Sequence, residues 1–234
     1  MNYGNLFLIN LRYLLSFLGI LKIIKIIIGI FNKEKEYEKK YSEAMLKSVE
    51  NNFCIWDVGA NKGIYIKKFL KINKANSVIA FEPTPYLCKF IKSKFSVPIK
   101  NRKLFVYNFA LSDKSKKSFF WVSKKNSVEN SLIYHSDKIK ITVNQKKPDE
   151  LVTKKKFKIP NLIKLDIEGG ELKFLEGSKK ILKYKALRHL FIEVHFSKLN
   201  KLYGKNGVTK IIKILKNSGF KILWISSSQL HAKK

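Results

Sequence analysis

The chain has 234 residues, which is enough for one sizeable hydrophobic core and a short additional segment. Hydrophobic residues account for 45% of the sequence and charged residues for 28%, so an intrinsically disordered chain is excluded. The formal net charge of +31 favours contact with a polyanion: nucleic acid, an anionic membrane surface or an acidic substrate. The lysines are spread along the whole chain, however, so a solvated basic surface without such a partner explains the charge equally well.

The first predicted element is a strongly apolar segment at residues 5–31, which Arg12, Lys22 and Lys25 interrupt. A helix that crosses a bilayer needs about 20 predominantly apolar residues, and central basic residues are costly in it. Three alternatives stay open: a helix in the interface of an anionic membrane, a true span or uncleaved signal anchor, and a helix packed on the domain or a partner. No small-residue cleavage site follows, so a removed signal peptide is not predicted.

Residues 32–50 are dense in charges of both signs and predict an exposed helix, with Glu36 four residues before Lys40. We interpret this segment as a joint between the apolar segment and a folded domain. The predicted division is therefore an apolar helical arm with its charged joint at 1–50, and one domain at 51–234.

From residue 53 onward, short apolar runs alternate with segments that repeat apolar residues at helical spacing. Strands that alternate with helices predict a mostly parallel central sheet with helices on both faces, which is a Rossmann-like α/β domain. The strands are expected at 53–58, 77–81, 104–109, 161–166, 190–194 and 220–225. The helices are expected at 62–72, at 85–95, after residue 166 through 182, and at 208–217.

Residues 114–160 break this alternation. The runs Phe119–Val122 and Ile139–Val143 predict two strands of an inserted antiparallel element. We expect this insert, together with the C-terminal segment, to determine which molecule the protein selects.

The chain contains two cysteines, Cys54 and Cys88, whose spacing suggests neither a zinc site nor a disulfide framework. Cys54 sits in an apolar run, where a buried and inert thiol is expected. This usage fits a reducing compartment, and we expect a cytoplasmic protein that can associate with a membrane through its N-terminal helix.

The turn after the first predicted strand carries the pattern Asp57-x-Gly59-x-Asn61-x-Gly63. Glycines in such a turn let a ligand approach the backbone, and the start of the next helix offers free N–H groups. The spacing differs from the G-x-G-x-x-G of nicotinamide enzymes, and a carboxylate at the strand end suits a cationic or hydroxyl-rich ligand. The alternative is an ordinary tight turn, but the pattern favours a nucleotide or S-adenosylmethionine site.

Glu82 strengthens the ligand-binding interpretation. It closes the second predicted strand, 19 residues after Gly63 (82 − 63). An acid near this offset can accept both ribose hydroxyls of an adenosine, and Pro83 and Pro85 stiffen the turn behind it. The two motifs together predict an adenosine-containing cofactor, although a lone acid at a strand end would predict little.

Five short motifs occur in order along the chain: DVGANKG at 57–63, FEP at 81–83, ALSD at 110–113, KLDIEGGE at 164–171 and IEVH at 192–195. Together they resemble the FkbM-type family of S-adenosylmethionine-dependent methyltransferases. The resemblance covers roughly residues 53–225, and five strings in order are more specific than any single one. It implies a Rossmann-like class I methyltransferase fold, S-adenosylmethionine as the methyl donor, and usually a hydroxyl acceptor on a sugar or polyketide-like product.

The resemblance also implies which residues hold the cofactor. The methionine side is expected at the first turn, the ribose at the acid after the second strand, and the adenine along the segment from Asn108 to Ser112. The cofactor-binding residues expected in this way are Asp57, Gly59, Ala60, Asn61, Gly63, Glu82, Asn108, Ala110 and Asp166.

Two features depart from the family. Its members usually continue beyond the sixth strand into a seventh, whereas this chain ends at Lys234, soon after Ile225. We therefore expect a truncated or rudimentary C-terminal hairpin. The apolar segment at 5–31 also lies outside the resemblance.

Methyl transfer is an in-line displacement at a sulfonium carbon, so the protein mainly aligns the reactants and excludes water. A hydroxyl acceptor also benefits from a base, and a histidine or carboxylate can serve. The sequence places a cluster of acids and a histidine at the C-terminal ends of the fourth and fifth strands, where open α/β sheets bind ligands. We expect catalytic roles for Asp166, Glu168, Glu193 and His195.

Other interpretations of these residues stay open. Glu168 and Glu171 also suit the N-terminus of a helix, where acids stabilise the helix dipole, and His195 also suits a structural role. A divalent metal held by the same acids is the less favoured alternative, so no metal is predicted.

The favoured hypothesis is an O-methyltransferase that acts on a glycan or lipid-linked sugar at the cytoplasmic face of a membrane. The net charge of +31 motivates an RNA methyltransferase as the alternative. A non-catalytic, membrane-associated module that kept the fold is a further alternative. The sequence lacks the Asn-Pro-Pro-Tyr of amino-methylating nucleic-acid enzymes and the Pro-Cys nucleophile of cytosine C5 chemistry.

Overall fold

The computed structural model describes residues 30–72, 74–123, 138–154 and 157–234. The predicted apolar segment at 5–31 therefore lies almost entirely outside the described residues, and its relation to a membrane stays a prediction. Within the described part of the chain, no helix is both long and apolar enough to cross a membrane.

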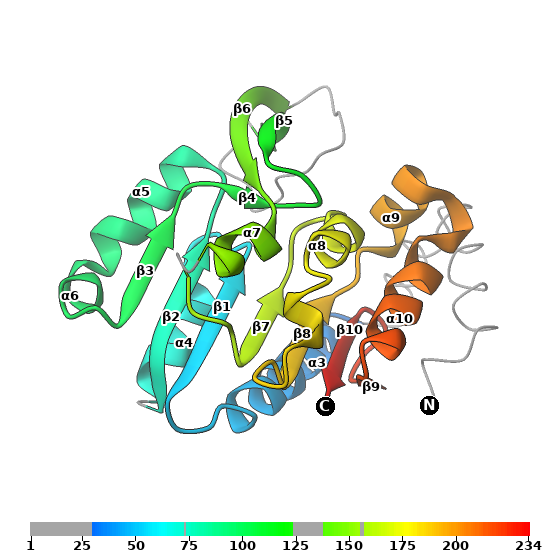
Figure 1. Ribbon diagram of the computed structural model, residues 1–234, viewed down its shortest axis with the longest axis horizontal. Coiled ribbons are helices and arrows are strands. Elements are labelled where there is room, and N and C mark those ends of the chain that lie inside the picture. Colours follow the sequence, from blue (N-terminus) through cyan, green and yellow to red (C-terminus); the bar gives the residue numbers. More distant parts are fainter. Residues whose placement is uncertain (1–29, 73, 124–137, 155–156) are drawn as a thin grey trace.

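A seven-stranded sheet forms the centre of the molecule, in the strand order β3-β2-β1-β7-β8-β10-β9 (Figure 1). Within this sheet, the five neighbouring strands β3, β2, β1, β7 and β8 pair in parallel. Strand β10 pairs antiparallel with both β8 and β9. All six predicted strands are present, and the strand order reverses direction between β1 and β7. The strands are β1 (Phe53–Val58), β2 (Ala75–Phe81), β3 (Leu104–Tyr107), β7 (Leu162–Leu165), β8 (His189–Glu193), β9 (Lys221–Trp224) and β10 (Gln229–Lys233).

The C-terminal hairpin is complete, so the expectation of a truncated one was wrong. Strand β10 inserts between β8 and β9, and its Leu230 and Ala232 are fully buried. The turn before it is closed by Ser226, whose hydroxyl accepts hydrogen bonds from the backbone N–H groups of Ser228 and Gln229. A five-residue strand that contains a histidine and follows three serines carries too little apolar periodicity to be recognised from sequence.

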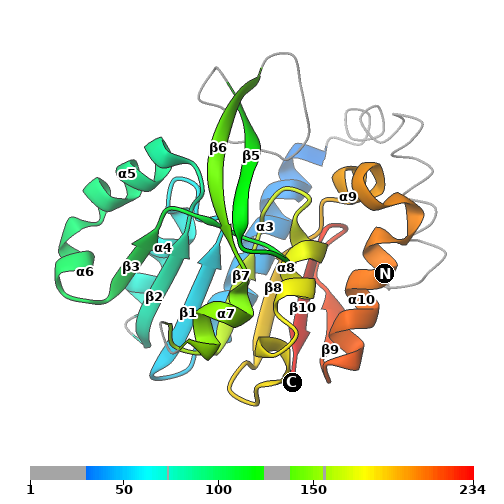
Figure 2. The same ribbon diagram turned by 45° about the horizontal axis from the view of Figure 1, so that its top comes forward.

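Helices cover both faces of the sheet (Figures 1 and 2). One face carries α3 (Ile30–Lys47), α4 (Ile64–Lys71), α5 (Pro85–Lys94) and α6 (Ser96–Lys100). The other carries α7 (Pro148–Thr153), α8 (Glu171–Gly177), α9 (Phe196–Tyr203) and α10 (Gly207–Asn217), with short 3₁₀ turns at Ile181–Lys183 and Gly204–Asn206. The helix expected to continue through residue 182 therefore ends at Gly177.

Helix α3 differs from the exposed joint that its charges predicted. Its Tyr41 and Met45 are buried against the sheet, and the Tyr41 ring lies edge-on to Phe191 with ring centroids 5.6 Å apart. The expected pair of Glu36 and Lys40 is present on the other side of the helix at 2.6 Å. The prediction of an exposed helix was therefore correct only for the solvent-facing side of α3. A few buried side chains are enough to pack a helix against the sheet even when its other positions are charged.

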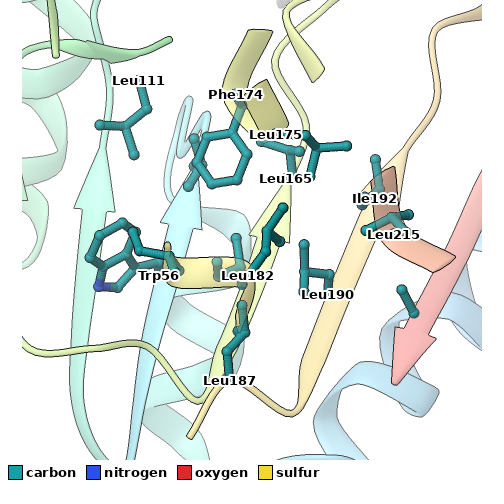
Figure 3. Close-up of a cluster of buried hydrophobic side chains, with 14 of the residues drawn as sticks. Trp56, Leu111, Leu165, Phe174, Leu175, Leu182, Leu187, Leu190, Ile192 and Leu215 are labelled. Carbon is teal, nitrogen blue, oxygen red and sulfur yellow. The ribbon is translucent and has the colours of Figure 1, made fainter. Parts of the chain in front are cut away.

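The hydrophobic core between the sheet and helices α8 and α10 is continuous (Figure 3). Trp56 of β1, Phe174 of α8 and Leu215 of α10 are fully buried in it. Each such side chain contributes about 1.5–3 kcal/mol through removal from water, so this layer fixes α8 and the turn that precedes it against β7 and β8.

The insert contributes two strands to a second, three-stranded sheet above the edge at which the parallel strands end, and the segment just before the insert contributes the third (Figures 1 and 2). Strands β5 (Lys116–Ser123) and β6 (Lys138–Lys146) pair antiparallel, as predicted, and the short β4 (Ala110–Leu111) pairs with β6. The hairpin thus stands over the point where the strand order of the main sheet reverses.

The loops after β1 and β7 approach each other so closely at Gly59 that a larger residue cannot fit. Gly59 has φ +83°, and a Cβ there would lie 1.9 Å from the carbonyl oxygen of Asp166. Gly219 has a similar φ of +85° but has nothing within 4 Å of its Cβ position. A comparison of alanine substitutions at Gly59 and Gly219 therefore distinguishes the cost of backbone strain from the cost of a steric clash.

We predict that Gly219→Ala lowers the free energy of unfolding by about 1–2 kcal/mol, which is the strain of a left-handed alanine. Gly59→Ala should lower it by at least about 3 kcal/mol, because overlap with the Asp166 carbonyl adds to the same strain. Urea denaturation of both variants measures the difference. Equal losses would show that the two loops separate without penalty.

Candidate functional site

A pocket opens at the C-terminal ends of β1, β2 and β7, below the β5–β6 hairpin. This is the point where the strand order reverses, which is where open α/β sheets bind ligands. The pocket is lined by Val58, Gly59, Asn61, Phe81, Glu82, Pro83, Thr84, Phe109, Ala110, Leu111, Ser112, Phe120, Gln145, Asp166, Ile167, Glu168 and Gly170.

The structure brings half of the sequence-predicted site residues to this pocket. Those that line it are Gly59, Asn61, Glu82, Ala110, Asp166 and Glu168. Those that lie behind or beside it are Asp57, Ala60, Gly63, Asn108, Glu193 and His195. Sequence reasoning missed the two hairpin residues Phe120 and Gln145, because no motif in the insert indicated which of its faces turns inward.

Glu82 clamps the two loops that form one wall of the pocket. Its Oε2 accepts a hydrogen bond from the backbone N–H of Asn61, and its Oε1 accepts one from the N–H of Thr84, both at 2.8 Å. Burial raises the pKa of this carboxyl, and the hydrogen bonds from Thr84 and Asn61 act in the opposite direction. The side chain of Thr84 also donates a hydrogen bond to this carboxylate, and the lone pair that remains can accept a hydroxyl from a ligand.

Two of the predicted residues shape the pocket without lining it. Asn108 donates from Nδ2 to the carbonyl oxygens of Glu82 and Pro83, both at 2.9 Å, and so holds the loop after β2. Gly63 precedes α4, where a Cβ would lie 2.7 Å from the ring of Phe95.

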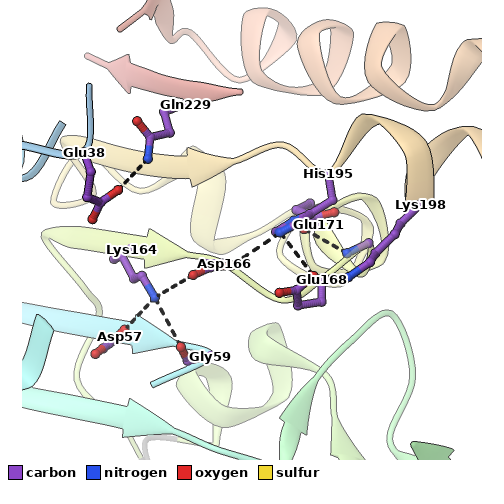
Figure 4. Close-up of polar contacts among 11 residues, drawn as sticks. Glu38, Asp57, Gly59, Lys164, Asp166, Glu168, Glu171, His195, Lys198 and Gln229 are labelled. Atoms are coloured by element: carbon purple, nitrogen blue, oxygen red, sulfur yellow. Dashed lines mark hydrogen bonds and ion pairs between the residues drawn. The ribbon is translucent and has the colours of Figure 1, made fainter. Parts of the chain in front are cut away.

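Lys164 connects the ends of β1 and β7 (Figure 4). It is 4% exposed, and its Nζ lies 3.5 Å from Asp57 Oδ1 and 3.3 Å from Asp166 Oδ2. The ammonium also donates to the carbonyl oxygen of Gly59 at 3.2 Å. Burial lowers the pKa of Lys164, but the charges of Asp166 and Asp57 outweigh it and the net pKa is raised.

Asp57 needs this ammonium group. Its carboxylate is fully buried, and neither oxygen has a hydrogen-bond partner among the described residues. Burial raises the pKa of Asp57, and the nearby charge of Lys164 opposes that rise. Asp57 therefore acts on the pocket through Lys164 and the loop at Gly59.

His195 lies within a cluster of carboxylates beside the pocket (Figure 4). Its Nδ1 is 2.7 Å from Glu171 Oε1, and its Nε2 is 3.2 Å from Glu168 Oε2 and 3.7 Å from Asp166 Oδ1. Lys198 forms an ion pair with Glu168 from the other side. Burial alone would lower the pKa of His195, but the hydrogen bond and charge of Glu171 and the other two acids raise it to about 9.

Glu193 lies apart from this cluster. Along β8 its side chain alternates with Ile192 and shares the α3 side of the sheet with Phe191. It pairs across the strands with Gln229, whose side-chain amide donates to Glu38 of α3 at 2.8 Å. Burial, with a smaller contribution from Asp166, raises the pKa of Glu193 to about 7.

The acid–histidine cluster also has a spacing that a divalent cation could use. Asp166, Glu168 and His195 each offer a ligand atom within 4.8 Å of the others. Both carboxylates are already paired with ammonium groups, Asp166 with Lys164 and Glu168 with Lys198. These ammonium groups therefore compete with a cation for the same carboxylates.

Comparison with known proteins identifies a family and a curated relative. The family model described as the methyltransferase FkbM domain matches residues 57–222. A hexuronic acid methyltransferase, AglP from Haloferax volcanii, is 28% identical over 159 residues, which is 68% of this chain. The match covers 62% of that relative, so the chain spans less than two thirds of its length.

A solved structure supports the fold. The crystal structure of the FkbM methyltransferase from Methylobacillus flagellatus KT matches with a TM-score of 0.55 at 13% sequence identity. The superposition covers 78% of this chain and 44% of the other. At this identity the likeness bears on the fold alone, and it confirms the Rossmann-like prediction.

The central position of Lys164 leads to a stability prediction. Lys164→Met leaves Asp57 buried without a counter-charge, so the free energy of unfolding should fall by about 3–5 kcal/mol in urea denaturation. Adding Asp57→Asn to that variant should recover part of the loss, because the uncompensated charge is then gone.

Lys68→Met is the matched control for this substitution. Lys68 donates to the hydroxyl of Ser42 at 2.7 Å and, among the residues that the structure describes, forms no ion pair with a buried acid. Its replacement should change stability by less than about 1 kcal/mol. Equal effects of the two lysine substitutions would contradict the role given to Lys164.

Proposed function

The chain belongs to the FkbM methyltransferase family, and from this premise we propose that its pocket binds S-adenosylmethionine and that the protein methylates a hydroxyl group of a glycan sugar. The observation that carries the proposal is the pocket at the reversal of strand order, with the Glu82 clamp on one side and the His195 cluster on the other. In this proposal the Glu82 side of the pocket binds the adenosine, and the His195 cluster supplies a base beside it.

The residues of the pocket fit the cofactor. Gly59 lines the pocket and lets the loops after β1 and β7 meet there, because a Cβ at this position would lie 1.9 Å from the Asp166 carbonyl oxygen. Glu82 keeps one lone pair that can accept a ribose hydroxyl, as expected from its position after β2. The rings of Phe81 and Phe109, with centroids 5.5 Å apart, form an apolar wall suited to a base such as adenine.

The remaining predicted cofactor residues have supporting roles in this proposal. Asp57 orients Lys164, Asn108 fixes the loop after β2, and Ala110 lies beside the adenine. Ala60 and Gly63 shape the turn between β1 and α4.

When bound, S-adenosylmethionine supplies a methyl group activated by a sulfonium, so the protein mainly has to orient the acceptor and take up its proton. We assign the proton to His195 Nε2, which faces Asp166 and Glu168 at the pocket wall. These two carboxylates stabilise the imidazolium after proton transfer. The proton is not assigned to Glu193, because its side chain lies on the α3 side of the sheet, beside Gln229, and does not line the pocket.

The acceptor class rests on the curated relative, whose name gives hexuronic acid as its substrate. A sugar hydroxyl agrees with the need for a base, because an alcohol is a poor nucleophile until its proton is removed. Neither nucleic acid nor a membrane surface is supported by the comparisons, so the RNA alternative enters only as an arm of the experiment.

We predict that isothermal titration detects binding of S-adenosylhomocysteine, the demethylated product. Glu82→Ala should weaken it about 10- to 100-fold, through loss of two charge-assisted hydrogen bonds and of the ribose contact. His195→Asn should leave this affinity unchanged but lower methyl transfer to uronic-acid oligosaccharides about 100-fold or more.

His231→Asn serves as the control. His231 lies on β10, away from the pocket, and is buried against Phe191 and His189 of β8. It should change neither cofactor binding nor transfer. Neutral oligosaccharides and RNA are offered in parallel. Methyl incorporation into RNA alone would overturn the glycan proposal, and absence of any cofactor binding by folded protein would overturn the whole assignment.

A further inference from the structure

Glu171 links the starts of two helices on the pocket side of the sheet. It is the first residue of α8 and is fully buried, whereas His195 directly precedes α9. Glu171 Oε1 accepts a hydrogen bond from the backbone N–H of Gly169 at 3.0 Å and contacts His195 Nδ1 at 2.7 Å. An ionised carboxylate has no proton to donate, so His195 Nδ1 must be the donor.

Helix capping explains only half of this arrangement. An acid in the first turn of a helix stabilises it, and the contact with Gly169 serves that purpose. Capping gives no reason for a buried carboxylate to hold the imidazole of a residue 24 positions away, at the start of another helix.

The contact determines what the other ring nitrogen can do. With the proton fixed on Nδ1, the neutral imidazole has its lone pair on Nε2. Nε2 faces Glu168 and Asp166, and both of these side chains line the pocket.

We propose that Glu171 is a positioning residue, whose carboxylate holds the Nδ1–H of His195 so that Nε2 is presented to the acceptor side of the pocket as the proton-accepting atom. This inference rests on the proposed function, because it assigns the base of that reaction its tautomer and orientation. It goes beyond that function in giving Glu171 a role that capping alone does not supply.

Several charged groups face His195 and determine its titration. Glu171 approaches from α8, and Asp166 and Glu168 approach from the turn after β7. Glu193 interacts with it from the end of β8.

Two ammonium groups offset these acids, since Lys198 of α9 pairs with Glu168 and Lys164 of β7 pairs with Asp166. The net effect on His195 is a pKa of about 9, although burial by itself acts in the opposite direction. The imidazole is then mostly protonated at neutral pH, and the fraction able to accept a proton grows as the pH rises towards 9. Transfer should therefore rise with pH over this range.

Two variants of Glu171 separate charge from orientation. Glu171→Gln keeps a carbonyl oxygen that can accept the Nδ1–H but removes the negative charge. The pH midpoint of kcat/KM should therefore move down by about one unit, with kcat at high pH reduced less than about 10-fold. Glu171→Ala removes the acceptor as well, so kcat should fall about 10- to 100-fold while the affinity for S-adenosylhomocysteine stays unchanged.

Glu176→Gln is the matched control, since it removes a half-buried acid from the same helix without touching His195. It should leave the pH midpoint unchanged. Thermal unfolding of all three variants checks that they are folded. If Glu171→Gln and Glu176→Gln share the wild-type pH midpoint, Glu171 is a structural cap and the proposal is overturned.

Nitrogen-15 NMR of labelled histidine tests the same contact without any acceptor. In the wild type, the neutral ring of His195 should carry its proton on Nδ1, and its pKa should fall in Glu171→Gln. A proton on Nε2 instead would overturn the proposal even in an active enzyme. An Nδ1–H ring in a protein that transfers methyl to no sugar would support the contact while the proposed acceptor fails, so the two failures are distinguishable.

Discussion

The site depends on one buried ammonium group. Lys164 lies where β1 and β7 meet, directly opposite Asp57 in the strand pairing, and two residues before Asp166. A fully buried carboxylate such as Asp57 is strongly unfavourable unless a positive charge compensates it, and a buried lysine is unfavourable for the same reason. Each makes the other tolerable, and both are then held at the edge where the ligand pocket opens.

The hydrogen bond from Lys164 to the Gly59 carbonyl extends this constraint to the backbone. The loop after β1 can lie against the loop after β7 only because Gly59 has no Cβ to meet the Asp166 carbonyl. The same loop continues to Asn61, whose backbone N–H donates a hydrogen bond to the carboxylate of Glu82. The wall of the pocket is therefore one connected set of contacts, in which a buried charge pair fixes a loop and that loop positions a carboxylate clamp.

The parts of this arrangement that the sequence predicted are those with local signals. The glycine turn, the second strand that ends in Glu82 and the alternation of strands and helices all follow from spacing within a few residues. The sequence did not predict the central role of Lys164, because a lysine within a short strand ordinarily faces solvent. Its burial depends on Asp57, which lies more than 100 positions earlier in the chain.

The same reasoning accounts for the other misses. Strand β10 is defined by its pairing with β8 and β9 rather than by its own composition. Glu171 looked like a helix-capping acid because the partner that distinguishes it, His195, comes from the next strand–helix junction. Asp57 and His195 lie at the strand ends that the sequence predicted, but their position relative to the pocket depends on packing that spacing does not reveal.

The distribution of charge now has a physical interpretation. The chain has only 17 acidic residues against 48 basic ones, yet Asp57, Asp166, Glu168, Glu171 and Glu193 all gather at one edge of the sheet. A basic chain gains from dispersing its acids among its lysines, so their concentration here works against the electrostatics of the rest of the molecule. Such a concentration of carboxylates is favourable where it stabilises positive charges close by, namely those of a buried lysine, of an imidazolium that has taken a proton, and of a cationic cofactor. The net charge of the chain therefore describes its surface, whereas the chemistry of the pocket follows from the local excess of carboxylates.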